Sequence, residues 1–122
     1  WLVSLLPATT LGKIDNEQVL LVQYARQEAI KNDINPERFI KLINCESRLE
    51  KMAKGDYRSE EKKFMARGIL QFWEGTFDKF SAKYKFKGDY HNPYNQISLA
   101  ALMIGDGLWG HWYNCGKAVG YK

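Results

Sequence analysis

Glu46 is the residue whose type and position point most directly to chemistry. It follows Phe39, Ile40 and Ile43 at three- to four-residue spacing, which places it on the apolar face of a helix near the C-terminal end. Burial disfavours the charged form of a carboxyl group, and the negative end of the helix dipole acts in the same direction, so both raise its pKa. Such a group can stay protonated near neutral pH and act as a general acid. A solvated surface glutamate is the alternative that this pattern alone leaves open.

The helix that carries this carboxyl group has a well-marked start. Asn35 can cap the first turn with its side chain, and Pro36 suits the first helical position because no amide proton is needed there. An earlier helix is expected over residues 15–31, where apolar side chains form a stripe that opens with Asp15 or Asn16 as the cap.

The remaining elements are also expected to be helical, apart from one irregular stretch. Residues 52–67 contain a mixed charge run and no sustained period, which favours a loop or a small irregular β-like excursion. A helix is expected over residues 74–84, followed by a loop over residues 85–92. Pro93 then opens a helix that is apolar nearly all round up to Ile104. The pattern therefore predicts a mainly α protein, a helical bundle around one central buried helix.

Length and composition fit one globular domain. The chain has 122 residues, of which 45% are hydrophobic and 26% charged, so it can bury one ordinary core and does not have a disordered composition. The net charge of +4 suits an anionic polymer such as a cell wall, and it would also suit nucleic acid. Because the basic residues are dispersed, no nucleic-acid partner is expected. We expect a single domain over residues 1–122, working as a monomer, with residues 1–14 as a peripheral segment.

Two further features bear on where the protein works. No apolar run approaches the roughly 20 residues of a membrane-spanning helix. The apolar residues 1–6 are short and lack a basic leader, so they are not identified as a signal peptide, and both the remnant of a longer precursor and the start of an excised domain stay open. Cys45 and Cys115 lie far apart without metal-ligand spacing, which favours a disulfide over two buried thiols, and a disulfide would place the protein outside the reducing cytoplasm. His91 and His111 have no partner spacing for a metal, so neither a metal nor a cofactor is expected.

Four short motifs follow one another along the chain. They are Cys45-Glu46-Ser47, Gly68-Ile69-Leu70-Gln71, Asn92-Pro93 with Gln96-Ile97, and Tyr113-Asn114-Cys115-Gly116. In this order they resemble the Glu-Ser pair, the Gly-Leu-Met-Gln-like turn, the Asn/Asp-Pro helix start with Asn-Ile, and the Tyr-Asn-Ala-Gly element of lytic transglycosylases. Goose-type and phage lysozymes share that fold, and Gly-Ile-Leu-Gln also resembles animal lysozymes. Each motif alone is weak, but four in order across nearly the whole chain make a strong signal.

The resemblance implies a lysozyme-like α+β fold in which the β-like excursion forms one wall of a substrate cleft. Glu46 would be the catalytic residue, and the turn Gly68-Ile69-Leu70-Gln71 would offer backbone and amide contacts to an N-acetyl sugar. A plain buried hairpin strand is the alternative for this turn. Ser47 would either contact the cleft or bond locally. Tyr113 and Asn114 would belong to the substrate site.

Two positions depart from the family pattern. Gln96 stands where the family has Asn, which puts a secondary substrate or structural contact in doubt but not the acid. Cys115 replaces the Ala of Tyr-Asn-Ala-Gly, and in this fold the Tyr-Asn element packs beside the catalytic helix, which would bring Cys115 close to Cys45. The resulting disulfide would fasten Tyr113 next to Glu46, where its hydroxyl could orient the acid. A core aromatic with its hydroxyl at the surface is the alternative for Tyr113.

The chemistry that the resemblance implies uses one carboxyl group. Animal lysozymes carry a second carboxylate two residues before the Gly of Gly-Ile-Leu-Gln, and this chain has Ala66 there. Asp56 and the Glu60-Glu61 pair lie in the preceding stretch, with nothing in the sequence to fix them near the site. We therefore expect an extracytoplasmic lytic transglycosylase that cleaves the MurNAc–GlcNAc β-1,4 bond of peptidoglycan strands through Glu46 and releases 1,6-anhydro-muramyl products. A lysozyme that uses water, and an inactive glycan-binding protein on the same fold, are the alternatives.

Overall fold

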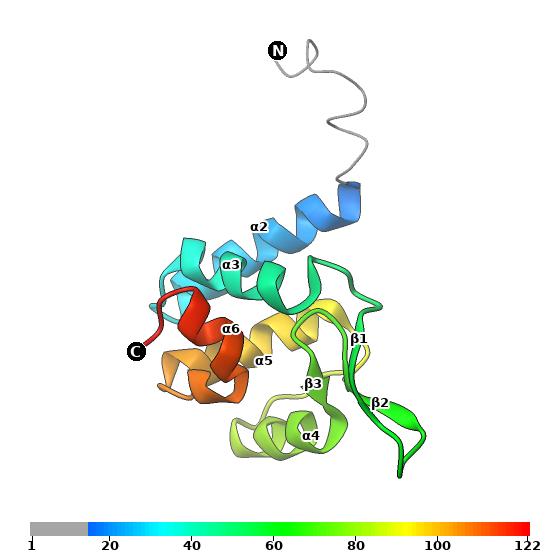
Figure 1. Ribbon diagram of the computed structural model, residues 1–122. Helices are drawn as coiled ribbons and strands as arrows, with labels where there is room; N and C mark the ends of the chain where they lie inside the picture. Colours follow the sequence, from blue (N-terminus) through cyan, green and yellow to red (C-terminus); the bar gives the residue numbers. More distant parts are fainter. Residues whose placement is uncertain (1–14) are drawn as a thin grey trace.

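The computed structural model describes residues 15–122, in which the helices pack together and one small sheet lies at their side (Figure 1). The predicted peripheral segment, residues 1–14, lies outside the described residues. The helices are α2 (Asn16–Lys31), α3 (Pro36–Ser47), α4 (Glu74–Lys83), α5 (Pro93–Gly105), the 3-10 helix η2 (Trp109–Trp112) and α6 (Tyr113–Ala118). The strands β1 (Lys54–Arg58), β2 (Lys63–Arg67) and β3 (Phe72–Trp73) form an antiparallel sheet in that order.

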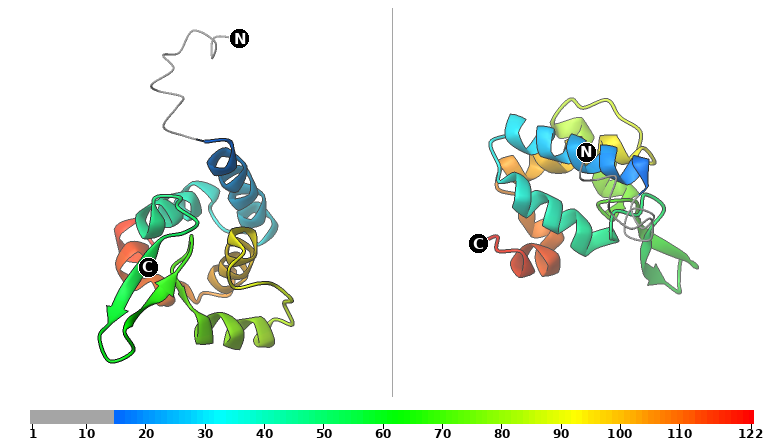
Figure 2. Two further views of the ribbon diagram at one scale, coloured as in Figure 1. Left: turned by 90° about the vertical axis from the view of Figure 1, so that its right-hand side faces the viewer. Right: turned by 90° about the horizontal axis from the view of Figure 1, so that it is seen from above.

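Helix α5 is the central buried helix that its composition predicts. Eight of its 13 residues are buried, and both α2 and α4 pack against it. Figure 2 shows α2 and α5 side by side, with α3 and α6 on the far side of the core from α4. The start of α5 is fixed by Asn92, whose side chain accepts hydrogen bonds from the amides of Tyr94 and Asn95. The predicted mainly α architecture around a central buried helix is thereby confirmed.

The irregular excursion of the sequence is the β1–β2 hairpin, which extends away from the helices (Figure 1). In its register Lys54 lies opposite Arg67, and Arg58 lies opposite Lys63. Nearly all side chains of β1 are exposed, as are two of the five in β2. A strand that is exposed to solvent on both faces does not need alternating polar and apolar residues, and this explains why the sequence shows no period of two here.

None of the helices within residues 15–122 combines the length and hydropathy that crossing a bilayer requires. In the same part of the chain, no three side chains of the metal-ligating types His, Cys, Asp and Glu gather into a group.

Candidate active site

Glu46 lies one residue before the end of α3, where its spacing places it. The helix begins as predicted, because the Asn35 side chain accepts a hydrogen bond from the Arg38 amide at 3.0 Å and Pro36 occupies the first turn. It ends at Ser47, and the following residue, Arg48, caps it: the Arg48 backbone turns into the left-handed region at φ 55° and its amide donates to the Asn44 carbonyl. The last turn of α3 therefore holds the Glu46 backbone in one defined position.

The environment of the Glu46 carboxyl group favours its protonated form. The residues three and four positions earlier on the same face, Ile43 and Leu42, are fully buried, and Glu46 itself is half-buried. This burial raises the pKa of Glu46 above its ordinary value of 4.5. No Lys or Arg among residues 15–122 forms an ion pair with it. Desolvation thus acts on this acid without a compensating positive charge.

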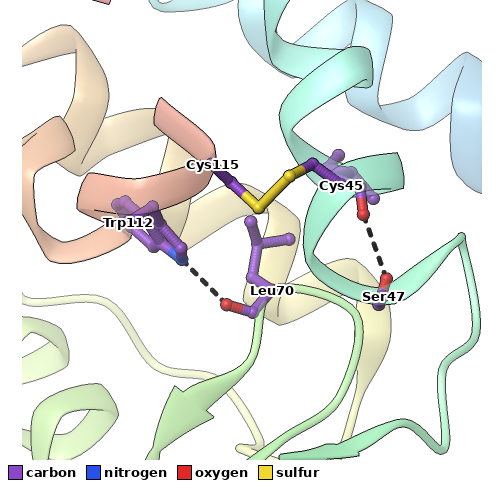
Figure 3. Close-up of a disulfide and its surroundings, with 6 residues drawn as sticks. Cys45, Ser47, Leu70, Trp112 and Cys115 are labelled. Carbon is purple, nitrogen blue, oxygen red and sulfur yellow. Dashed lines mark hydrogen bonds between the residues drawn. A yellow bond between two sulfur atoms is a disulfide. The ribbon is translucent and has the colours of Figure 1, made fainter. Parts of the chain in front are cut away.

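A disulfide joins α3, the helix of Glu46, to the C-terminal part of the chain. Cys45, directly before Glu46, is bonded to Cys115 of α6, with their Cα atoms 5.8 Å apart. The pairing that the resemblance implies is confirmed. Figure 3 shows the Leu70 side chain pointing towards this bond, while the Trp112 indole donates from Nε1 to the Leu70 carbonyl at 2.8 Å. The acid's helix, α6 and the Gly-Ile-Leu-Gln segment are therefore fastened to one another.

The Gly-Ile-Leu-Gln segment is a turn that leads into β3, rather than a plain hairpin strand. Gly68 has φ +87° and Gln71 has φ 52°, and the Gln71 amide donates to the Gly68 carbonyl across the turn. The side-chain amide of Gln71 donates both of its N–H groups within the protein, to the carbonyls of Ala53 and Gly68. Only its carbonyl oxygen, which lies against Gly55, is left to accept a bond from a sugar.

The Gln96 side chain of α5 holds this turn by hydrogen bonds, a role that the sequence did not reveal. Its side chain is 2% exposed, and Nε2 donates to the carbonyls of Arg67 and Tyr90 at 3.1 and 2.9 Å. Its Oε1 accepts from the Leu70 amide at 3.0 Å. A Cβ atom at Gly68 would lie 2.7 Å from the Gln96 side-chain carbon, so both the positive φ and the close approach require glycine there. Gln96, which stands where the family pattern has Asn, therefore makes a structural contact.

Three of the predicted substrate residues lie inside the protein. Ile69 and Leu70 expose no surface, and both backbone polar groups of Leu70 are already bonded. The prediction of direct sugar contacts therefore does not fit these two residues, which form the packed underside of the turn. Ser47 is 7% exposed and its hydroxyl donates to the Ile43 carbonyl, which is the local bond named as its alternative.

Tyr113 and Asn114 stand at the surface of α6, next to the disulfide. Tyr113 is 58% exposed, and its ring stacks on Trp109 at 6.0 Å with Lys117 over it. Among the hydrogen bonds of residues 15–122, none joins the Tyr113 hydroxyl to Glu46. Its proposed part in orienting the acid thus stays a prediction, as does a substrate contact for exposed Asn114.

Asp56 is a carboxylate that the structure holds in place, although no pattern in the sequence predicts this. It lies on β1 with a left-handed backbone at φ 52°, and its side chain accepts from Trp73 Nε1 at 3.0 Å and from Arg58 Nε at 3.1 Å. The neighbouring Gly55 touches the Gln71 side chain, so Asp56 adjoins the turn. Ala66, the position of the second carboxylate in animal lysozymes, is buried.

A concavity of about 200 Å³ continues from the turn towards η2. Its lining includes Gln71, Trp73, Thr76, His111 and Trp112, and burial together with nearby Lys79 lowers the pKa of His111. Its polar edges and indole rings offer the mixture of stacking surface and hydrogen-bonding groups that sugars use. Trp73 and His111 are absent from the sequence prediction, because neither belongs to one of the four motifs.

These features agree with the comparison to protein families. The family model described as Transglycosylase SLT domain matches residues 23–118, so the chain belongs to this family. No curated protein and no solved structure matches the chain. The matched range contains α3, the turn and α6, which are the elements that carry the candidate site.

Membership of this family assigns the function at the level of class. The domain acts on peptidoglycan, and its activity is of the lytic transglycosylase type. Action on peptidoglycan takes place outside the cytoplasm, in agreement with the Cys45–Cys115 disulfide.

Proposed function

We propose that the protein cleaves the β-1,4 bond between N-acetylmuramic acid and N-acetylglucosamine, with Glu46 as its single catalytic residue. The observation that carries this proposal is the state of the Glu46 carboxyl group, which is half-buried at the end of α3 and has its pKa raised by that burial. A carboxyl group of this kind holds its proton until negative charge develops on a leaving oxygen.

The reaction proceeds in two proton transfers at the same carboxyl group. Glu46 first donates its proton to the glycosidic oxygen as the bond to C1 breaks, and the acetamido group of the substrate supports the oxocarbenium-like centre. The carboxylate then removes the proton of the muramyl 6-hydroxyl, whose oxygen closes on C1. The product is a 1,6-anhydro sugar, and Glu46 regains its proton, so neither a metal nor a cofactor takes part.

The internal hydroxyl competes with water for the same centre. Intramolecular attack can reach effective molarities of about 10⁵–10⁸ M when the geometry is right, which favours the anhydro product. A lysozyme-type hydrolysis is supported by one observation: Asp56 is held by Trp73 and Arg58 beside the turn, where it could position a water. The products distinguish the two reactions.

Glu46→Gln tests the acid. The variant keeps the shape of the side chain but has no proton to donate, so wall-lytic activity should fall by at least about 10²-fold, within the range of general-acid contributions. Glu50→Gln, the same change at an exposed glutamate four residues further on, is the matched control and should keep full activity. Retention of more than roughly a tenth of the activity in Glu46→Gln would remove Glu46 as the acid.

Mass spectrometry of the released muropeptides tests the outcome. Anhydro products are lighter than reducing-end products by one water molecule, and we expect them from both the wild type and Asp56→Asn. Products with reducing ends only, lost in Asp56→Asn, would identify a lysozyme that uses the same Glu46. Binding of purified walls without loss of turbidity would identify a glycan-binding protein without catalysis.

A further inference from the structure

A basic concavity lies on the side of the turn formed by the sheet and the loop before α5. Its volume is about 280 Å³, and its lining includes Lys51, Lys54, Arg67 and His91 together with Gly68 and Gln96. No Asp or Glu belongs to this lining. The pocket is therefore unusual in charge for a protein whose net charge is only +4.

Two of these cations are placed against each other without compensation. Lys54 of β1 lies directly opposite Arg67 of β2 in the antiparallel register, so their side chains leave the sheet on the same face. Like charges in directly opposite positions destabilise a strand pair. Among residues 15–122 neither side chain forms an ion pair, and the guanidinium of Arg67 has only a long contact of 3.5 Å to the Phe64 carbonyl.

Two other cations nearby are neutralised, whereas Lys63, which lies opposite Arg58, forms no ion pair within residues 15–122. Lys51 forms an ion pair with Glu17 at 2.7 Å, and Arg58 forms one with Asp56 at 3.1 Å. Lys54 and Arg67 thus form a like-charge pair in facing positions, and an anion bound between them would offset the repulsion expected of such a pair.

The basic lining continues beyond this pocket. A second concavity of about 430 Å³ shares Arg67, Tyr90 and His91 with the first and adds Lys63, with Glu74 as its one acidic residue. Two adjoining hollows that share residues fit an extended anionic chain better than a single small ion.

We propose that the pocket between Lys54 and Arg67 binds a carboxylate of the peptide that peptidoglycan carries on its muramyl residues. This inference rests on the proposed function, because it takes the glycan strand as the substrate. The pocket is lined by Gly68, which belongs to the turn predicted to line the glycan cleft, and by Gln96 of α5, which bonds to that turn. A peptide attached to the same strand is therefore carried towards the pocket whenever the strand binds, whereas a separate wall polymer is not.

Binding of a synthetic muramyl peptide tests the pocket without catalysis, because this probe has no glycosidic bond to cleave. Its carboxylates are left free in one preparation and converted to amides in another. The double variant Lys54→Gln/Arg67→Gln should bind the free form at least about tenfold more weakly than the wild type, the size expected for charge-assisted hydrogen bonds, and the amidated form equally. The matched control Lys62→Gln/Lys87→Gln removes two exposed lysines that line neither concavity, and it should bind like the wild type.

Each outcome bears on one claim. Equal affinity of Lys54→Gln/Arg67→Gln and the wild type for the free peptide would overturn the proposal that this pocket binds a peptide carboxylate. Tighter binding of poly(glycerol phosphate) than of the peptide would also overturn it. If walls are not cleaved but the peptide binds selectively through Lys54 and Arg67, the proposed function fails and the pocket stands. If walls are cleaved and the substitutions do not weaken peptide binding, the reverse holds.

Protein stability supplies an independent readout. Because the two cations repel each other in the unliganded protein, Lys54→Gln should leave the melting temperature unchanged or raised, even if Arg67→Gln affects folding. A fall in melting temperature with Lys54→Gln would show that this lysine stabilises the hairpin, and would overturn its assignment to ligand binding.

Discussion

Replacing Gln96 by leucine tests whether this side chain positions the turn. The two side chains have similar volumes, but leucine can neither donate nor accept a hydrogen bond. The substitution therefore removes three hydrogen bonds at once, to the Leu70 amide and to the carbonyls of Arg67 and Tyr90, without opening a large cavity.

The expected loss of stability follows from the burial of the three partners. Leu70 and Tyr90 are buried, so their backbone groups would be left without water, whereas half-buried Arg67 can be solvated. A buried polar group without a partner costs about 1–3 kcal/mol, which gives about 2–6 kcal/mol for the two. For a chain of this size the melting temperature should fall by roughly 10 °C or more.

Thermal and denaturant unfolding measure this loss against a matched control. Gln27→Leu makes the same chemical change at an exposed position of α2 and should stay close to the wild type. Gln96→Asn, which is shorter by one methylene group, should fall between the two because it can keep some of the three bonds. If Gln96→Leu melts within a degree or so of Gln27→Leu, the three bonds do not hold the turn and the reasoning is refuted.

The same variant should separate positioning from acid chemistry. Measured well below both melting temperatures, kcat/KM of Gln96→Leu should fall by up to roughly 100-fold, as a small misplacement of a substrate-binding segment can cause. The pH dependence should stay that of the wild type, because Gln96 does not contact Glu46. A pH profile that moves with Gln96→Leu would show that the substitution acts on the acid itself.

Three further predictions concern the frame of the site. Replacing Cys45 and Cys115 together by serine should lower the free energy of unfolding by about 4 kcal/mol, from the entropy of the loop that the bridge closes; denaturant unfolding measures it, and an unchanged midpoint would contradict it. Because Glu46 must be protonated and burial raises its pKa above 4.5, activity should fall as pH rises through that raised pKa. The same pKa shift makes the folded wild type lose stability as pH rises from 4.5 through the raised pKa. The melting temperature of Glu46→Gln should therefore equal that of the wild type at pH below 4.5 and exceed it at neutral pH. Trp112→Phe should cost about 1–3 kcal/mol, because the buried Leu70 carbonyl loses its partner, whereas Trp109→Phe, which loses a bond at the surface, should cost less; equal losses would argue against the Trp112 bond.

Local signals in the sequence were sufficient for the elements that carry the acid. Asn35 and Pro36 act through their immediate neighbours, so the start of α3 follows from the residues themselves. The buried character of α5 follows in the same way from a composition that is apolar on all sides. The disulfide required the resemblance in addition, because the count of two cysteines left free thiols open.

Long-range contacts account for what the sequence did not predict. Gln96 bonds to residues that precede it by 26 and 29 positions, and no local pattern marks a glutamine for that use. Asp56 bonds to Trp73, 17 positions further on, from a left-handed backbone conformation inside an exposed strand, and neither feature produces a periodic pattern in the sequence. The surface position of Tyr113 depends on how η2 leads into α6. Neither of these two helices was predicted, because the glycines around η2 interrupt the helical pattern of the sequence.

Both departures from the family pattern act on the frame around the acid rather than on the acid. Gln96 bonds the turn to α5 from one side, and Cys115 ties α6 to the helix of Glu46 on the other. The Trp112 bond to Leu70 connects the two, so the path from Glu46 to the turn runs through the disulfide and one indole. A frame built in this way holds Glu46 and the turn at a fixed separation, which the proposed proton transfer requires, because a general acid must lie within hydrogen-bonding reach of the oxygen that it protonates. It follows that opening the disulfide should reduce turnover more than the loss of stability alone accounts for.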